Sequence, residues 1–165
     1  MRKTAALLLL LCASIGHTDD DLTVKYGANV SSDAEKMGRT KAIFIADQSS
    51  FKYLPFLLQQ YEVGSWFDNS GIQGRRSSLM GGYSLGVNVN AGSMYAQALV
   101  GPALISSPDS NLGGNLQFNN DISIGLRDLR TEATIGLSYK HISSAGIAEP
   151  NRGRDFFMFR VGIPW

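Results

Sequence analysis

Apolar and polar residues alternate one by one along most of this chain, and this period of two limits its possible folds more than any other feature. Between residues 79 and 89, for example, Leu79, Tyr83 and Leu85 occupy odd positions, while the even positions hold Met, Gly, Ser and Asn. Successive side chains of a β-strand point to opposite faces, so such alternation is typical of strands with two different faces. Past residue 20, no segment keeps the period of about 3.6 residues that marks an amphipathic helix. The sequence therefore predicts an all-β protein.

Strand-like segments recur along the chain at a regular spacing. The alternation, clear in some segments and weaker in others, predicts eight strands at residues 22–30, 39–47, 56–69, 78–89, 93–105, 116–126, 132–140 and 157–165. Short connections near residues 91 and 129 alternate with long polar ones near 73, 110 and 149, and we also expect a loop over Gln48–Pro55. Short turns at one end and long loops at the other are typical of outer-membrane β-barrels. The aromatic Trp165 at the end of the last segment is also typical of such barrels.

Two kinds of barrel fit this pattern, because a period of two cannot distinguish a lipid-facing wall from a packed core. One is a soluble, lipocalin-like barrel and the other is a transmembrane barrel. The inward positions are rich in Gly, Ser, Asn and Gln, which suits the polar interior of a small membrane barrel. Charged residues make up 18% of the chain, below the roughly 25% of soluble domains. We therefore predict an eight-stranded antiparallel transmembrane β-barrel, too narrow for a pore, whose function resides on its loops or outer wall.

The first residues have the pattern of a leader. Met1–Lys3 is cationic, Thr4–Ala13 is almost wholly apolar, and small residues follow at Ser14 and Gly16. This order is typical of a secretory signal peptide. The apolar run is shorter than the roughly 20 residues of a membrane-spanning helix, although an N-terminal anchor is the alternative.

The expected division is a cleaved leader over residues 1–18, cut near Gly16–Thr18, and a barrel over residues 19–165 in the bacterial outer membrane. The only cysteine, Cys12, leaves with the leader, so we expect no disulfide. The 15 Lys and Arg residues nearly balance the 14 Asp and Glu residues without a basic run, which argues against a nucleic-acid partner. Since His17 lies in the leader region, a second imidazole is lacking and we expect no metal site.

A polar group continues the outer face at the end of the predicted strand 132–140. His141 and Ser143 occupy odd positions, so they face the same side as the lipid-facing residues of that strand. Asp155 has the same parity as Phe157 in the last strand. The three side chains should therefore meet at the rim of the apolar wall, where they match the nucleophile, base and carboxylate of a serine hydrolase. The non-catalytic interpretation is that polar residues simply gather at the membrane–water boundary.

The residues around this group form an extended motif. The chain has His-Ile-Ser-Ser-Ala-Gly at residues 141–146, Pro-Asn-Arg-Gly at 150–153, and then Asp155. This stretch resembles the lipid A 3-O-deacylase family of eight-stranded outer-membrane hydrolases, whose motif is His-x-Ser-Asn-Ala-Gly, then Pro-Asn-x-Gly and an acidic residue two places on. The segments Asn111–Gly113 and Leu116–Phe118 and the last strand are also similar, so the resemblance covers about residues 110–165.

The resemblance implies a role for each member of the polar group. In the family, the serine matched by Ser143 attacks the ester at the 3-position of lipid A, and the histidine matched by His141 takes its proton. Asp155 corresponds to the acidic residue, which is usually Glu in the family and one methylene longer. Glu149, on the same loop, is the alternative acid.

The resemblance also implies how the reaction intermediate is held. Asn151 and the backbone N–H near Gly146 match positions suited to an oxyanion hole. Ser144 replaces the usual Asn of the family, which implies the loss of a supporting hydrogen bond. Four loop arginines are candidates for contacting the phosphates of lipid A: Arg75, Arg76, Arg152 and Arg154.

The combined prediction is an outer-membrane esterase that removes the 3-O-linked 3-hydroxyacyl chain of lipid A, without a metal or cofactor. Its partner is the lipid A of lipopolysaccharide in the outer leaflet, and the sequence leaves open whether the barrel forms a homodimer. One alternative is a non-catalytic small barrel with adhesive or structural loops. Another is a barrel acyltransferase, which would need a phospholipid donor.

Overall fold

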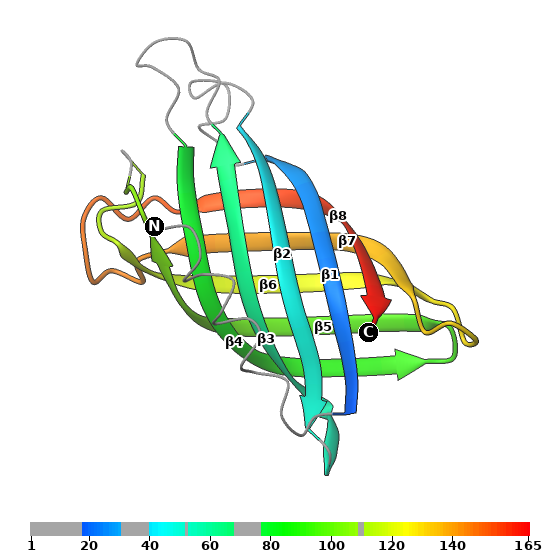
Figure 1. The fold of residues 1–165 in the computed structure, drawn as a ribbon. Coiled ribbons are helices and arrows are strands. Elements are labelled where there is room, and N and C mark those ends of the chain that lie inside the picture. Colours follow the sequence, from blue (N-terminus) through cyan, green and yellow to red (C-terminus); the bar gives the residue numbers. More distant parts are fainter. Residues whose placement is uncertain (1–17, 31–39, 52, 68–76, 109–110) are drawn as a thin grey trace, which may run out of the picture.

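A closed antiparallel barrel of eight strands forms the molecule (Figure 1). The computed structural model describes residues 18–30, 40–51, 53–67, 77–108 and 111–165. Each strand pairs with the next, and the last pairs with the first: β1 (Thr18–Asn29), β2 (Lys41–Phe51), β3 (Leu54–Phe67), β4 (Ser77–Ala91), β5 (Met94–Ile105), β6 (Leu116–Arg127), β7 (Thr134–Ser143) and β8 (Arg154–Pro164). The predicted all-β class and strand number are confirmed. Within the described ranges, no helix is long and apolar enough to cross a membrane.

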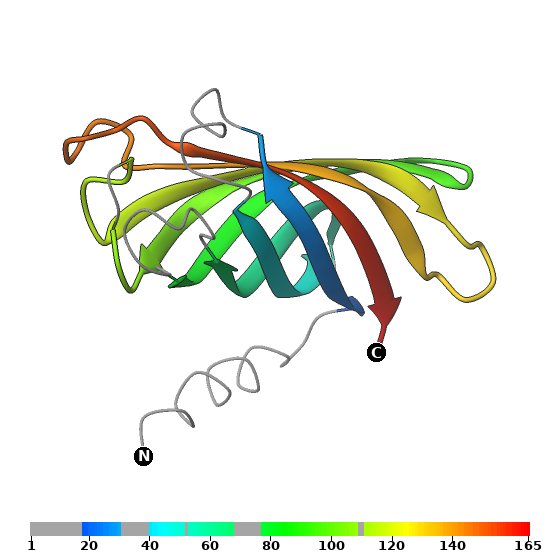
Figure 2. The same ribbon diagram turned by 90° about the horizontal axis from the view of Figure 1, so that it is seen from above.

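The connections differ at the two ends of the barrel. The segments 106–108 and 111–115 and the loop 144–153 lie at one end, called the loop end below, whereas hairpins 92–93 and 128–133 lie at the other (Figure 2). The predicted leader, residues 1–18, lies outside the described part of the chain apart from Thr18, where β1 begins.

The predicted loop over Gln48–Pro55 is wrong. Strand β2 continues to Phe51 and β3 begins at Leu54, so only a tight connection remains. The polar residues that suggested a loop are paired across the two strands instead. Gln48 faces inward and its amide donates to Gln60 at 2.8 Å, while Gln59 donates to Ser49 at 3.1 Å. Gln48 is therefore polar because it belongs to the polar interior, and Ser49 and Gln59 pair with each other on the other face, so these residues do not mark a break in the strand.

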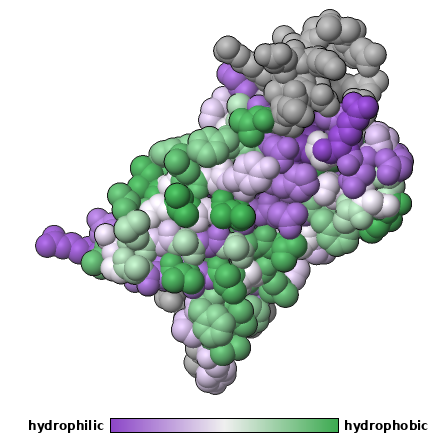
Figure 3. Space-filling view, turned by 180° about the vertical axis from the view of Figure 1, so that it is seen from behind, coloured by the Kyte–Doolittle hydropathy of each residue, from purple (hydrophilic) through white to green (hydrophobic). Residues whose placement is uncertain are grey.

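The outer wall is apolar, as expected of a surface in contact with lipid. Alternate residues of every strand expose large apolar side chains, among them Val24, Ile45, Leu79, Val100, Ile122, Leu137 and Phe159. Figure 3 shows apolar residues over much of this wall, with hydrophilic residues gathered toward the loop end.

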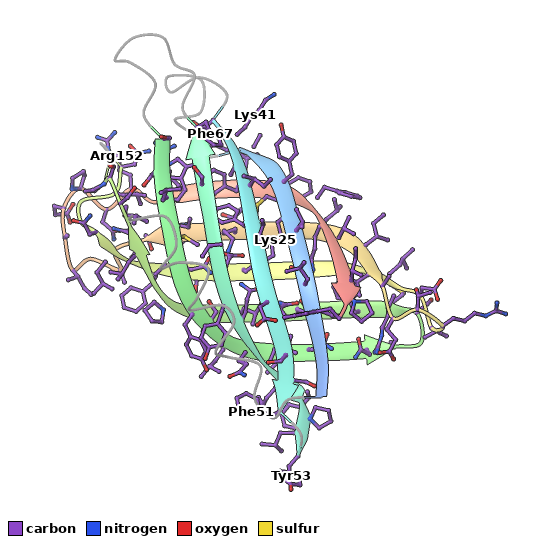
Figure 4. All side chains as sticks on the ribbon, viewed as in Figure 1. Lys25, Lys41, Phe51, Tyr53, Phe67 and Arg152 are labelled. Carbon is purple, nitrogen blue, oxygen red and sulfur yellow. The ribbon has the colours of Figure 1, made fainter. Side chains whose placement is uncertain are left out.

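The inward residues divide the interior into two parts. Beneath the loop end lies an apolar cluster of Ala42, Phe44, Trp66, Met80, Ala103, Ile105, Leu112, Ile142, Phe156 and Met158. Near the middle, where Figure 4 labels Lys25, the side chains of Lys25 and Lys140 each contact both Glu62 and Asp121 at 2.6–3.2 Å. All four side chains are buried. Arg160 lies beyond them and donates to Gln48 and Gln97. The described side chains thus fill the interior beneath the loop end with apolar groups.

Candidate active site

The strand register brings His141 and Asp155 together on the outer wall. His141 on β7 lies directly opposite Asp155 on β8, and Asn120 on β6 lies opposite His141 on its other side. Ser143 lies opposite Phe118 on β6, two residues nearer the loop end. These positions continue the outward face of their strands, so the polar group lies at the loop-end rim of the apolar wall.

His141 is oriented by the carboxylate of Asp155. Its Nδ1 lies 2.8 Å from Oδ1 of Asp155, and the two side chains are 34% and 22% exposed. When Nδ1–H donates to this carboxylate, Nε2 is the nitrogen that can accept a proton. Glu149, the alternative acid, instead accepts a hydrogen bond from the backbone N–H of Asn151 at 3.1 Å. The geometry therefore favours Asp155 as the partner of the imidazole.

Ser143 shares the outer face with His141 but is not bonded to it. Ser143 is the last residue of β7 and is partly exposed. Among the described residues, no hydrogen bond joins its hydroxyl to the imidazole. Such contacts are often long in ligand-free enzymes and tighten when substrate binds. The serine and histidine are two positions apart on one strand face, which separates their backbones by roughly 7 Å.

A tight turn follows Ser143 and contains the predicted oxyanion residue Gly146. Ala145 and Gly146 have φ values of 52° and 80°, and the N–H of Ile147 donates to the carbonyl of Ser144 at 3.0 Å. Two successive positive φ values are the signature of a type I′ turn, which favours glycine at its second central position. Ser144 is buried and its hydroxyl donates to the carbonyl of Ala148 at 2.7 Å. This hydrogen bond stabilises the loop from within, even though the Asn of the family motif is absent.

Asn151 lies next to this turn. Its Oδ1 accepts the N–H of Ser144 at 2.9 Å, so its NH₂ group is the part that can donate to a substrate. The neighbouring loop supports it, since Leu112 pairs with Asn151 as an isolated bridge and the N–H of Arg152 donates to Asn111 at 3.0 Å. The similarity noted around residue 111 therefore corresponds to a segment that holds the loop of Asn151.

Gly153 packs against the imidazole. Its φ is +73°, and a Cβ added there would lie 2.6 Å from Cε1 and 3.3 Å from Nε2 of His141. Both the backbone conformation and the close approach require glycine. The glycine of the Pro-Asn-x-Gly motif therefore leaves room for the ring in its observed orientation.

The predicted phosphate ligands differ in their placement. Arg152 is exposed in loop 144–153, at the loop end (Figure 4). Arg154 is only 2% exposed, because β8 begins there and the alternation turns its side chain inward opposite Ile142. The expectation that Arg154 contacts lipid phosphates is therefore wrong. Arg75 and Arg76 lie outside the described residues.

Two polar residues that are not part of the sequence motif also lie beside His141 and Asp155. The hydroxyl of Tyr139 donates to Oδ1 of Asp155 at 2.5 Å, and Asn120 flanks His141 on β6. Tyr139 has the same parity as His141, so the alternation carried the signal for its position. Within the described part of the chain, no group of three or more His, Cys, Asp and Glu residues is arranged to hold a metal ion.

Comparison with known proteins gives relatives in sequence and in fold. A curated lipid A deacylase PagL of Bordetella bronchiseptica is 41% identical over 64 residues, which cover 37% of this chain and 35% of that protein. The match thus spans about a third of the length of that relative. A crystal structure of the outer membrane enzyme PagL superposes with a TM-score of 0.62 at 20% identity, over 88% of this chain and 99% of that one. The crystal structure of Neisserial surface protein A gives a TM-score of 0.60 at 11% identity, over 89% and 96% of the two chains.

The two structural likenesses establish the fold alone, because both identities are low. The model of the family described as lipid A 3-O-deacylase (PagL) matches residues 54–164, which is more than half of the chain. This match includes the strands from β3 to β8 and every residue of the candidate site. The chain belongs to the lipid A 3-O-deacylase (PagL) family.

Proposed function

We propose that this protein hydrolyses the 3-O-linked acyl ester of lipid A in the outer membrane, with Ser143, His141 and Asp155 as its reactive group. The observation that carries the proposal is the His141–Asp155 contact of 2.8 Å on the outer wall. An oriented imidazole at the rim of a lipid-facing surface suits an ester of a membrane lipid. Family membership supports the same substrate.

Each proposed step uses a group of this hairpin. Ser143 Oγ attacks the acyl carbonyl while its proton passes to Nε2 of His141, and Asp155 stabilises the imidazolium that forms. The NH₂ of Asn151 and the N–H groups near Gly146 donate to the developing oxyanion. The bond between the acyl carbon and the sugar oxygen then breaks, and His141 returns the proton to that oxygen.

Water completes the proposed cycle. With His141 again acting as base, a water molecule attacks the acyl-serine, and the Ser143 oxygen recovers its proton. The products are an under-acylated lipid A and a free 3-hydroxy fatty acid. No atom of a metal or cofactor enters this balance.

The place of the site in the membrane supports a lipid A substrate. Lipid A occupies the outer leaflet, and outer-membrane barrels have their short turns on the periplasmic side, so the loop end would face that leaflet. The exposed Arg152 would then lie on the same side as the phosphates of the lipid head group. The apolar wall beneath the site would contact the acyl chains.

Mass spectrometry of lipid A after incubation with the purified, folded barrel tests the proposal. We expect the loss of one 3-hydroxyacyl chain from lipid A and its appearance as free acid. A gained acyl chain would instead indicate an acyltransferase. Unchanged lipid A would indicate a non-catalytic barrel and reject the proposal.

A further inference from the structure

The Asp155 carboxylate receives two hydrogen bonds on one oxygen. Oδ1 lies 2.8 Å from Nδ1 of His141 and 2.5 Å from the hydroxyl of Tyr139. Tyr139 precedes His141 by two positions on the same face of β7, so it lies diagonal to Asp155 across the β7–β8 pair. Side chains in such diagonal pairs are roughly 7–8 Å apart at the backbone, a span that a tyrosine covers.

A short carboxylate benefits from a second donor. Aspartate has one methylene fewer than the glutamate of the family motif, so its carboxylate has less reach toward the imidazole. A lone hydrogen bond to His141 would leave the carboxylate free to rotate about its last torsion, which is broad for Asp. A second donor on the same oxygen fixes the rotation that presents Oδ1 to the ring.

We propose that Tyr139 is a positioning residue for the reaction, whose hydroxyl holds the Asp155 carboxylate in the orientation that His141 requires. The inference rests on the proposed function, because it assigns Tyr139 a part in the same hydrolysis. Tyr139 touches neither the imidazole nor Ser143 through a hydrogen bond in the described structure. Its effect on the reaction passes through Asp155 alone.

Kinetics of Tyr139→Phe give the first test. A hydrogen bond to a charged group is typically strong enough that its loss should lower kcat by about 10- to 100-fold. KM should stay within about twofold, because the tyrosine does not bind substrate. The matched control is Tyr26→Phe, a lipid-facing tyrosine on β1 that is 52% exposed and lies opposite Phe159. A kcat of Tyr139→Phe equal to that of Tyr26→Phe, with both barrels folded, overturns the proposal.

An Asp155→Glu background distinguishes two roles of Tyr139: orienting the carboxylate of residue 155, or only stabilising the β7–β8 pair. In an Asp155→Glu background, the carboxylate reaches further toward His141 and should depend less on Tyr139. We expect Tyr139→Phe to lower kcat in this background by less than about threefold. A loss of the same size with and without the Asp155→Glu substitution would indicate that the tyrosine stabilises the β7–β8 pair and does not position the acid.

Nuclear magnetic resonance of the imidazole tests the inference without turnover. His141 is the only histidine after residue 17, so labelling histidine with ¹⁵N reports on this ring in the barrel. We expect a protected Nδ1–H signal in the unsubstituted protein and in Tyr26→Phe, and faster exchange of this proton in Tyr139→Phe. An unchanged signal in Tyr139→Phe overturns the inference in an active enzyme. Inactivity of the unsubstituted protein on lipid A rejects the proposed function even where the exchange rates differ, so the two failures are distinguishable.

Discussion

Two groups of ionisable residues in this barrel pair carboxylates with basic side chains, but the two groups have different roles. In the interior, the carboxylates of Glu62 and Asp121 each contact two lysines, and all four side chains are at most 1% exposed. On the outer wall, Asp155 contacts His141, and both side chains are partly exposed. Burial and full pairing make the interior group a structural one, because no substrate reaches it and each charge is neutralised. The outer group is suited to catalysis for two reasons. A substrate can reach it, and Nε2 of His141 is left to take a proton.

The interior and outer groups should respond to substitution in opposite ways: changes inside lower the stability of the barrel, and changes outside lower its activity. Ser143→Ala should have the largest effect on activity. Removing the nucleophile of a serine hydrolase typically lowers kcat by about 10³-fold or more, while the barrel should unfold at an unchanged denaturant concentration. Lipid A hydrolysis and urea unfolding in micelles measure the two quantities. Retention of more than about a tenth of the activity would show that another residue attacks the ester.

Asp155→Asn should follow, with a loss of about 10³-fold in kcat, since an amide orients the wrong tautomer of the imidazole and cannot stabilise its cation. Glu149→Gln is the matched control, because its carboxylate contacts the Asn151 N–H and not His141. We expect it to change kcat by less than about threefold. If Glu149→Gln inactivates the enzyme and Asp155→Asn does not, the acid has been assigned to the wrong residue.

Lys25→Met should act on the interior group alone. It removes a partner 2.6 Å from Asp121 and 3.0 Å from Glu62 and leaves buried negative charge uncompensated, which typically costs about 3–5 kcal/mol of folding free energy. Val24→Ala, the neighbouring lipid-facing position, should change the stability by less than about 1 kcal/mol. The activity per folded molecule should remain normal for both variants. Equal unfolding midpoints for Lys25→Met and the unsubstituted protein would contradict a structural role for the lysine.

Gly153→Ala should lower kcat by about 10-fold, less than the substitutions of Ser143 and Asp155, because the added methyl group displaces the His141 ring. Gly92→Ala is the control, since Gly92 also has a positive φ of +60° but nothing lies within 4 Å of its added Cβ. Both variants should lose about 1–2 kcal/mol of stability from the strained backbone. Only Gly153→Ala should lower kcat, and equal activities would indicate that the contact with the ring is unimportant.

The sequence predicted the fold because alternation is a local signal. Parity alone placed His141 and Asp155 on one outer face, and the structure has them in contact. The same rule places Arg154 inside the barrel, but only when β8 is known to begin at that residue. The ends of strands are poorly marked in the sequence when the loops and the inner faces are both polar. The wrong prediction of a loop at Gln48 has the same cause.

Contacts between distant strands could not be predicted from the sequence pattern. Lys25 and Asp121 meet across the barrel although 96 residues separate them. The local pattern of either strand does not predict this ion pair, because the contact depends on closure of the barrel and on the relative tilt of strands far apart in the chain. The Tyr139–Asp155 bond depends on a diagonal register in one hairpin, which the loop length alone does not determine.

The hairpin of β7, loop 144–153 and β8 contains every group assigned to the reaction, within one continuous stretch of the chain. A catalytic apparatus confined to two neighbouring strands can be inherited, lost or exchanged as a unit. The remaining hairpins are then free to diverge as long as they close the barrel and support loop 144–153 from residues 111–113. Under the proposed assignment, a small membrane barrel of this design is a general scaffold in which a single segment carries the chemistry.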